Sequence, residues 1–334
     1  MRQSVKVLAA RLLDWSGVLN RYERQQNSIK VLMLHRVSNA NNALGLSITP
    51  ELFEELVVFL KSRYEIISLE QAVDRLTNSQ KSVGCVLTFD DGYRDNYDCA
   101  FPVLKKFKAP ATIFVTLDAL DTGVFGWELF DQAIVQTNEE SIDLKQFGLE
   151  SYRMTGTDRT AVIVDLHRAL KRLPNDKKIQ IVQYVIARYG DSEKKQRTML
   201  TWEEAREMAD SGLITIGAHT ITHPILSRVD STQAQYEIIT GKSLIEDRLG
   251  LPVHYFAYPN GGVNDFNNEH VSMVKQAGYQ AACSTIAGTN NSDSNLFALR
   301  RIDITSRMCT DSAGRFLPSL LLAKTSGLFI RQGA

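Results

Sequence analysis

Two adjacent carboxylates, Asp90 and Asp91, follow the apolar run 83–89 and precede Gly92. Such a run is typical of a buried strand, and parallel α/β folds bind their ligands where the strands end. Neighbouring side chains at a strand end point in different directions, so one carboxylate can bind a metal while the other handles a proton. Asp-Gly is also a common pair in solvated turns, and that alternative stays open for these residues taken alone.

Two histidines, His219 and His223, lie in the segment IGAHTITHP, directly after the apolar run 213–217. Neutral imidazole is the commonest side-chain ligand of transition metals. A single histidine is more often structural, but a pair at this spacing after a strand favours a ligand pair. With Asp91 it forms a set of two histidines and one carboxylate that leaves coordination positions open. The set suits Zn²⁺, with Co²⁺, Mn²⁺, Ni²⁺ or Fe²⁺ as alternatives.

Three other segments carry polar residues beside predicted strands. In YFAYPNGG, residues 255–262, the proline fixes the backbone and the glycines permit close approach of a ligand, although an ordinary turn would look the same. His35 ends the first predicted strand, where a core or capping histidine is the alternative. Arg301 lies in LRRIDI, where surface charge is the simpler interpretation.

The elements that must position these residues alternate between strands and helices. Apolar runs predict strands at 29–34, 66–67, 83–89, 111–115, 213–217, 254–257, 280–284 and 297–304. Helix-start signals lie between them, such as the Thr-Pro-Glu sequence that begins at Thr49. This alternation predicts a parallel α/β sheet, either open or closed into a barrel. Residues 124–197 are charged and mostly helical in pattern, which indicates a helical insertion.

Composition excludes some classes of protein. The 334 residues contain 38 Lys and Arg against 38 Asp and Glu, and no basic stripe indicates a nucleic-acid partner. The four cysteines lack the spacing of metal or redox motifs and are expected to be reduced, which fits the cytoplasm. No segment resembles a secretory signal, and none reaches the roughly 18 apolar residues that span a membrane.

The N-terminal segment, residues 1–27, has the pattern of an amphipathic helix. Its predicted apolar face consists of Val5, Leu8, Leu12, Trp15 and Leu19. Such a helix either packs on the domain or docks at a membrane surface. We expect packing, with peripheral contact at the inner membrane face as the alternative.

Three motifs, LTFDDG, IGAHTITHP and FAYPNGG, in this order resemble those of the NodB-homology polysaccharide deacetylases, carbohydrate esterase family 4. The resemblance extends from about residue 28 to residue 305, is interrupted by the insertion, and implies an irregular (β/α) barrel. The expected organisation is an N-terminal segment (1–27), a deacetylase domain (28–310) with a helical insertion (124–197), and a C-terminal helical tail (311–334).

By this resemblance Asp91, His219 and His223 would hold the metal, and Asp90 would be the general base. Asn260 occupies the position whose backbone N–H is the family's oxyanion donor. The roles of Asp90 as base and of Asn260 as oxyanion donor follow from the resemblance, whereas the ligand set is also indicated by residue type and spacing.

The chain departs from the family pattern at two places. The third motif usually begins with an arginine, where this chain has Ala257, as in the exopolysaccharide N-acetylglucosamine deacetylase branch. Arg301 resembles an arginine found late in that branch and is expected beside Asp90. A C-terminal leucine-x-histidine motif is missing, and His35 matches the histidine that serves as the acid in that branch.

The resemblance implies a metal-dependent hydrolase that releases acetate from an N-acetylated sugar, in a polysaccharide or a glycan precursor, with a role in exopolysaccharide biosynthesis. Tyr93, Trp127 and Tyr258 are candidates for an aromatic platform under the sugar, although aromatic residues near strand ends more often serve packing. Two alternatives remain. One is a deacylase or deformylase of a lipid-linked or nucleotide-linked sugar at the cytoplasmic membrane face. The other is a catalytically silent carbohydrate-binding protein.

Overall fold

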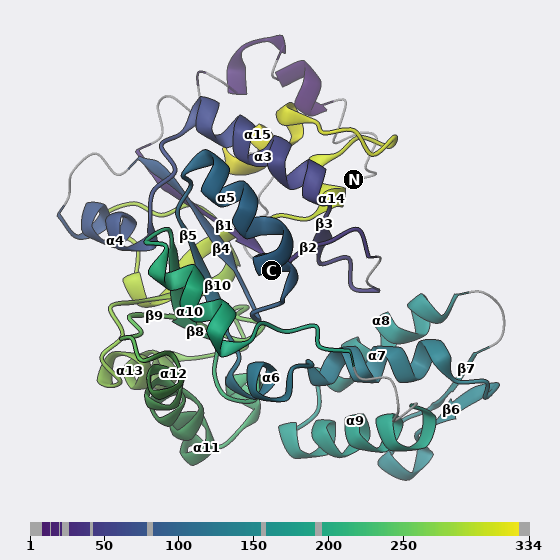
Figure 1. The fold of residues 1–334 in the computed structure, drawn as a ribbon. Coiled ribbons are helices and arrows are strands. Elements are labelled where there is room, and N and C mark those ends of the chain that lie inside the picture. The colour runs from purple at the N-terminus through teal and green to yellow at the C-terminus, as the bar shows by residue number, and fades with distance from the viewer. Residues whose placement is uncertain are drawn as a thin grey trace.

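A closed barrel of seven parallel strands forms the centre of the molecule, in the order β1-β11-β10-β9-β8-β5-β4 (Figure 1). The computed structural model describes residues 9–13, 15–19, 21, 27–40, 43–78, 83–154, 158–190 and 196–326. The barrel strands are β1 (Ile29–Leu34), β4 (Gly84–Phe89), β5 (Ala111–Val115), β8 (Ile214–Ala218), β9 (Tyr255–Ala257), β10 (Ala281–Ala287) and β11 (Leu299–Asp303). The predicted (β/α) barrel is therefore confirmed.

Helices cover the outside of the barrel, and three further helices, α7 (Gly126–Gln136), α8 (Arg159–Leu170) and α9 (Asn175–Tyr189), belong to the insertion. The other helices are α3 (Pro50–Arg63), α4 (Leu69–Thr77), α5 (Phe101–Phe107), α6 (Leu117–Thr122), α10 (Trp202–Asp210), α11 (Ser231–Gln235), α12 (Gly241–Leu249), α13 (Asn268–Gln276), α14 (Ser306–Cys309) and α15 (Pro318–Thr325). Two short sheets accompany them, β2 (Arg36–Val37) with β3 (Ser47–Ile48), and β6 (Ser141–Asp143) with β7 (Ser151–Arg153). The strand predicted at 66–67 is reduced to one bridge between Ile66 and Cys85.

Helix starts follow the capping signals of the sequence. The Thr49 side chain accepts a hydrogen bond from the Leu52 N–H at the start of α3. Thr201 and Glu204 form a reciprocal capping box at the start of α10. A cap of this kind contributes about 1 kcal/mol, because it satisfies backbone donors that the first turn leaves unpaired.

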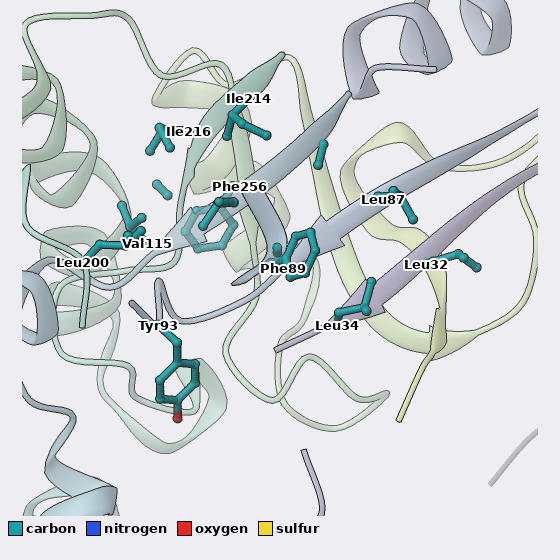
Figure 2. Close-up of a cluster of buried hydrophobic side chains, with 14 of the residues drawn as sticks. Leu32, Leu34, Leu87, Phe89, Tyr93, Val115, Leu200, Ile214, Ile216 and Phe256 are labelled. Carbon is teal, nitrogen blue, oxygen red and sulfur yellow. The ribbon is translucent and has the colours of Figure 1, made fainter. Parts of the chain in front are cut away.

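The barrel strands have an inner and an outer row of side chains. Strands β1 and β4 pair in register, with Val31 opposite Val86. Both residues belong to one buried cluster together with Phe114. The alternate residues, among them Leu32 and Leu87, join the outer helices in a larger core (Figure 2). The period of two along each strand thus assigns every strand residue to the barrel interior or to the helical layer.

The barrel interior is tightly filled beneath the site. A Cβ atom on Gly217 would lie 2.5 Å from the Phe114 ring, closer than side-chain atoms approach. A glycine in β8 therefore lets the Phe114 ring occupy the interior of the barrel.

The insertion lies to one side of the barrel and has its own apolar core (Figure 1). Helices α7, α8 and α9 contribute buried residues to this core, including Phe130, Leu166 and Ile181. The sequence pattern predicts mainly helices here, and the structure adds the hairpin β6–β7. The two strands are short and polar, with Ile142 as their buried member, so no hydrophobic alternation indicates them.

The described part of the N-terminal segment packs against the C-terminal helix α15. Ala10 and Leu19 are buried together with residues of α15. Leu12 and Trp15 are instead 56% and 88% exposed. The predicted apolar face is therefore wrong for these two residues, because the contact with α15 uses a different side of the segment.

Val5 and Leu8 of that predicted face lie outside the described residues, as does the end of the predicted tail, 327–334. Among the helices that the structure describes, none has the length and apolar character needed to cross a bilayer. The four cysteines all lie in described segments, and none of them forms a disulfide there.

Candidate active site

The carboxyl ends of the barrel strands surround a pocket of about 400 Å³. His35, Asp90 and His219 directly follow the strands β1, β4 and β8. Six of the predicted site residues line this pocket, and they are His35, Asp90, Asp91, His219, His223 and Asn260. Residues far apart in the sequence are thus brought together because parallel strands end at the same rim.

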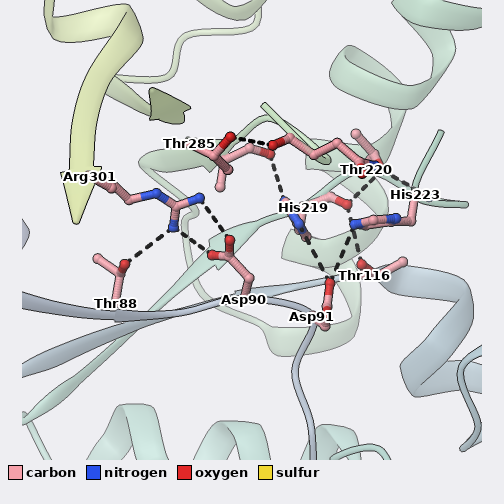
Figure 3. Close-up of polar contacts among 11 residues, drawn as sticks. Thr88, Asp90, Asp91, Thr116, His219, Thr220, His223, Thr285 and Arg301 are labelled. Atoms are coloured by element: carbon pink, nitrogen blue, oxygen red, sulfur yellow. Dashed lines mark hydrogen bonds and ion pairs between the residues drawn. The ribbon is translucent and has the colours of Figure 1, made fainter. Parts of the chain in front are cut away.

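Arg301 holds the Asp90 carboxylate from within the barrel (Figure 3). Its two terminal nitrogens, Nη1 and Nη2, donate to Oδ1 and Oδ2 of Asp90 at 2.7 Å each. Its Nε donates to the Ser284 carbonyl at 2.7 Å, and Nη1 also donates to the Thr88 hydroxyl at 3.2 Å. The side chains of Arg301 and Asp90 are 0% and 3% exposed. Arg301 is therefore a buried partner of Asp90 and not a surface charge.

This pair determines the ionisation of Asp90. Burial by itself would raise the pKa of the carboxyl group. The positive charge and the hydrogen bonds of Arg301 outweigh burial and hold the pKa of Asp90 below its usual range. Asp90 is consequently a carboxylate at neutral pH and can accept a proton.

Asp91, His219 and His223 turn three ligand atoms toward one point, with all three atoms within 4.8 Å of one another (Figure 3). Oδ1 of Asp91 lies 3.6 Å from Nε2 of His219 and 3.4 Å from Nε2 of His223. Nδ1 of His219 is 2.8 Å from the Ala257 carbonyl oxygen. A carbonyl can only accept, so Nδ1 carries a proton and Nε2 is the ring nitrogen that faces Asp91 and is available to a metal.

These three residues fit a divalent cation. Oδ1 of Asp91 is buried and has no hydrogen-bond partner within the described residues. Burial raises the pKa of the Asp91 carboxyl and lowers the pKa of His223 well below its usual value. A buried carboxylate without a partner is costly, and a cation between it and two neutral imidazoles would offset that cost.

The backbone of the site is strained at four positions. Asp91, Thr220, His223 and Asn260 have φ values of 76°, 66°, 58° and 59°. Elsewhere in the described chain, Lys108 is the one non-glycine residue with positive φ. Such conformations cost on the order of 1 kcal/mol or more each and persist where surrounding contacts enforce them. Their concentration here supports a functional site.

The loop that carries the histidines is held by Glu237, a residue that the sequence analysis did not single out. The buried Glu237 carboxylate accepts hydrogen bonds from the N–H groups of Ile221 and Thr222 at 2.8 and 3.0 Å, and from the Thr222 hydroxyl at 2.6 Å. In the sequence Glu237 is one acidic residue of a helical segment, and only its burial in the fold identifies it.

His35 and Asn260 offer polar groups to the pocket. Nδ1 of His35 is buried and has no hydrogen-bond partner in the described part of the chain. Among the same residues, the Asn260 N–H donates to no acceptor, while its carbonyl accepts from the Thr285 hydroxyl. Both groups are therefore available to a substrate, and the roles of acid and oxyanion donor remain predictions.

Two of the three aromatic candidates for a sugar platform, Tyr93 and Trp127, line the pocket. Tyr258 is 1% exposed, and its hydroxyl donates to the Phe297 carbonyl at 2.9 Å. Tyr258 therefore serves packing, which is the more common role of aromatic residues near strand ends, and it is not among the residues that line the pocket.

The insertion forms one wall of the pocket. Its contributions to the lining are Phe125, Trp127, Glu128, Asp131, His167, Lys171 and Lys178. Arg36 joins this wall to the barrel, because its Nε lies 2.8 Å from Asp95 and its Nη1 lies 2.6 Å from Glu128. Apart from Trp127, the sequence did not single out these lining residues, because they come from the part of the chain that contains none of the three motifs.

Comparison with known proteins agrees with this geometry. The family model described as polysaccharide deacetylase matches residues 77–173 and 164–282. YxkH of Bacillus subtilis (strain 168), a protein named for the same family, is 26% identical over 295 residues, which cover 87% of this chain and 77% of YxkH.

Two solved structures share the fold. Streptococcus pyogenes deacetylase PplD, in complex with acetate, has a TM-score of 0.59 at 20% identity, over 89% of this chain and 98% of PplD. IcaB from Ammonifex degensii has a TM-score of 0.55 at 19% identity, over 90% of this chain and 98% of IcaB.

The matched family residues span more than half of the chain and include the acidic pair and both histidines. Members of this family are hydrolases of carbon–nitrogen bonds other than peptide bonds, and they remove N-acetyl groups from sugars. The chain therefore belongs to the polysaccharide deacetylase family, the NodB-homology family that its motifs predicted.

Proposed function

We propose that the protein hydrolyses the N-acetyl group of a sugar with the help of a divalent cation held by Asp91, His219 and His223. One observation carries the proposal. A carboxylate that a buried arginine keeps ionised lies in the same pocket as a buried aspartate and two histidines whose ligand atoms face one another. Hydrolysis of an amide needs a base and an electrophile in such proximity.

The cation would polarise the amide carbonyl and activate a water molecule for attack. The donor set of two nitrogens and one oxygen suits Zn²⁺, with Co²⁺, Mn²⁺, Ni²⁺ or Fe²⁺ as alternatives.

The side chains of the protein supply the proton transfers. Asp90 takes a proton from the attacking water, and Arg301 keeps Asp90 ionised for that step. The Asn260 N–H donates a hydrogen bond to the carbonyl oxygen as it gains negative charge. His35 then donates a proton to the nitrogen of the leaving sugar amine, as histidine side chains do in general acid catalysis. The products are acetate and an amino sugar.

Two solved relatives agree with the proposal, one in the acid that it binds and one in its fold. PplD binds acetate in its solved structure, which is the acid that this reaction would release. IcaB shares the barrel. We propose a substrate of the N-acetylglucosamine type, in a polymer or in a glycan precursor in the cytoplasm.

Acid release from a panel of sugars tests the proposal. The purified protein is stripped with a chelator, reloaded with one metal at a time, and incubated with polymeric, lipid-linked and nucleotide-linked N-acetyl sugars and their N-formyl analogues. We expect acetate from the loaded protein and none from the stripped protein. Formate in place of acetate would support the deformylase. Sugar binding without release of acid by any loaded form would overturn the proposal in favour of a silent binding protein.

A further inference from the structure

Two lysines of the insertion line the pocket and have no part in the chemistry described above. Lys178, on α9, is 7% exposed. Lys171, directly after α8, keeps exposed surface but belongs to the same lining. Neither ammonium group forms an ion pair with a carboxylate of the described residues. A buried ammonium group without a counter-ion is unusual, because it loses hydration with no compensating charge.

The acidic residues around the lysines have other partners. Glu128 pairs with Arg36 at 2.6 Å, and Asp131 pairs with His167 at 2.7 Å. Asp90 is held by Arg301, and Asp91 belongs to the ligand set. Asp303, on β11, also lines the pocket and forms no ion pair with either lysine.

The surroundings of Lys178 hold its ammonium group in place without neutralising it. Nζ lies 5.4 Å from the centre of the Trp127 ring, within the range of a cation–π contact. Burial, opposed in part by the charge of Glu237 and assisted by Lys171, lowers the pKa of Lys178 to about 8. The group is therefore mostly protonated at neutral pH, and a bound anion would stabilise that form.

We propose that Lys178 and Lys171 form an anion subsite beside the deacetylation centre, so that the preferred substrate is an N-acetylated sugar carrying a phosphate or carboxylate group. This inference rests on the proposed function and narrows its substrate class. Lys178 would contact the anion in the buried part of the pocket, and Lys171 would attract it at the opening. Trp127 would place an aromatic surface next to the same subsite.

The test compares three small N-acetylated sugars that differ in charge. They are N-acetylglucosamine 1-phosphate, N-acetylmuramic acid, which carries a carboxylate, and the neutral methyl N-acetylglucosaminide. With the metal-loaded protein, kcat/KM for acetate release is measured for each. We expect the wild type to favour at least one anionic sugar over the neutral sugar by about tenfold or more. The more favoured anion distinguishes a phosphate source from a carboxylate source.

Variants connect that preference to the lysines. Lys178→Met keeps an apolar stem against Trp127 and removes the charge, and the ratio of anionic to neutral kcat/KM should fall about tenfold. Lys178→Arg keeps the charge and should recover part of the ratio. Lys177→Met is the matched control, because Lys177 is the neighbouring residue of α9 but does not line the pocket. It should leave the ratio unchanged.

Failure of the inference and failure of the proposed function give different results. Equal turnover of neutral and anionic sugars by the wild type would overturn the anion subsite and leave the deacetylase intact. An anion preference that survives Lys178→Met would overturn the assignment to Lys178. Absence of acetate from every sugar, polymers included, would overturn the proposed function and this inference together.

Discussion

Asp90 and Asp91 are neighbours in the sequence but occupy opposite electrostatic surroundings. Arg301 contacts Asp90 through two hydrogen bonds, whereas Asp91 faces two imidazoles. The positive φ of Asp91 contributes to this separation by changing the chain direction directly after the strand. Two identical side chains therefore acquire two different functions from their environment.

Replacement of the proposed base, Asp90, by asparagine tests catalysis independently of metal binding. Asp90→Asn should lower acetate release by about 10²-fold to 10⁴-fold while the bound metal, measured by mass spectrometry, stays at wild-type stoichiometry. His219→Ala should lose both activity and metal, because one of three ligands is gone. His254→Ala is the control, since His254 is exposed outside the pocket. Near wild-type turnover by Asp90→Asn would show that the base assignment is wrong.

Removal of the arginine should change the pH dependence of activity. The folded pKa of Asp90 is lowered, so the wild type should keep its base ionised as the pH falls toward and below the ordinary aspartate value of about 3.9. In Arg301→Met only burial and weaker charges act, and the pKa of Asp90 should rise. The acidic limb of kcat/KM should then move to higher pH by about one unit or more. If the acidic limb of the kcat/KM profile did not move, Arg301 would not control the ionisation of Asp90.

The same pair has a consequence for stability. Because the folded pKa of Asp90 is lowered, its contribution to the free energy of unfolding is present above about pH 3.9 and is lost as the pH falls through the folded value. Arg301→Met leaves a buried carboxylate unpaired and should cost about 3–5 kcal/mol. The double variant Asp90→Asn/Arg301→Met removes that charge and should recover much of the loss, which provides a soluble control if the single variant folds poorly.

The sequence alone does not distinguish the two adjacent arginines, Arg300 and Arg301, and only their positions in β11 do so. Arg300 is exposed and Arg301 is buried, because consecutive residues of β11 face opposite sides of the sheet. Composition alone favours surface charge for both. The resemblance singled out Arg301, and the strand alternation explains why this residue reaches Asp90.

At the scale of elements, the histidine loop depends on the segment between α11 and α12. Glu237→Gln removes the negative charge of the carboxylate that accepts hydrogen bonds from the N–H groups of Ile221 and Thr222. Metal affinity, measured by titration against a chelating dye, should fall about 10-fold to 100-fold, since supporting hydrogen bonds orient the ligands. Glu207→Gln is the control, because Glu207 binds the Tyr97 hydroxyl in an exposed position. Equal metal affinity in both variants would contradict a positioning role for Glu237.

Strands were predictable where burial is complete. The run 29–34 agrees with β1, and the predictions at 83–89 and 111–115 agree with β4 and β5 to within a residue, because both faces of these strands are apolar. The hairpin β6–β7 was not predictable, because three-residue strands with one buried side chain leave no periodic pattern. The predicted strand ends agree with the observed ones where an apolar run ends at a turn, whereas the short polar strands were not predicted.

In the molecule as a whole, Arg36 links the insertion to the barrel through ion pairs with Asp95 and Glu128. The side chains of Arg36, Asp95 and Glu128 are 15%, 11% and 16% exposed. Arg36→Met leaves two largely buried acids without their partner and should lower the free energy of unfolding by about 3–5 kcal/mol. Arg94→Met breaks the pairs that Arg94, whose side chain is 44% exposed, forms with Asp98 and Glu204, and it should cost about 1 kcal/mol or less. If a denaturant titration gave equal losses of unfolding free energy for Arg36→Met and Arg94→Met, Arg36 would not be the residue that links the insertion to the barrel.

The predicted site and the observed pocket differ at this largest scale. Motifs at strand ends indicated the ligand set and the base, because the ends of parallel strands converge whatever the loops contain. They could not indicate Asp131 or Lys178, because α7 and α9 reach the pocket only through the packing of the insertion. The opening between barrel and insertion is therefore a property of the tertiary structure alone.

The ligand set also joins two distant parts of the chain. Asp91 and His219 lie on either side of the whole insertion, so a cation between them would act as a cross-link that closes a long loop. Stability should then follow the concentration of free metal, with about 2.7 kcal/mol gained at one hundred times the dissociation constant. A chelator should lower the melting temperature of the wild type and leave that of His219→Ala unchanged. In a cell with fluctuating metal supply, the lifetime of the folded chain would then depend on the same ion as its catalysis.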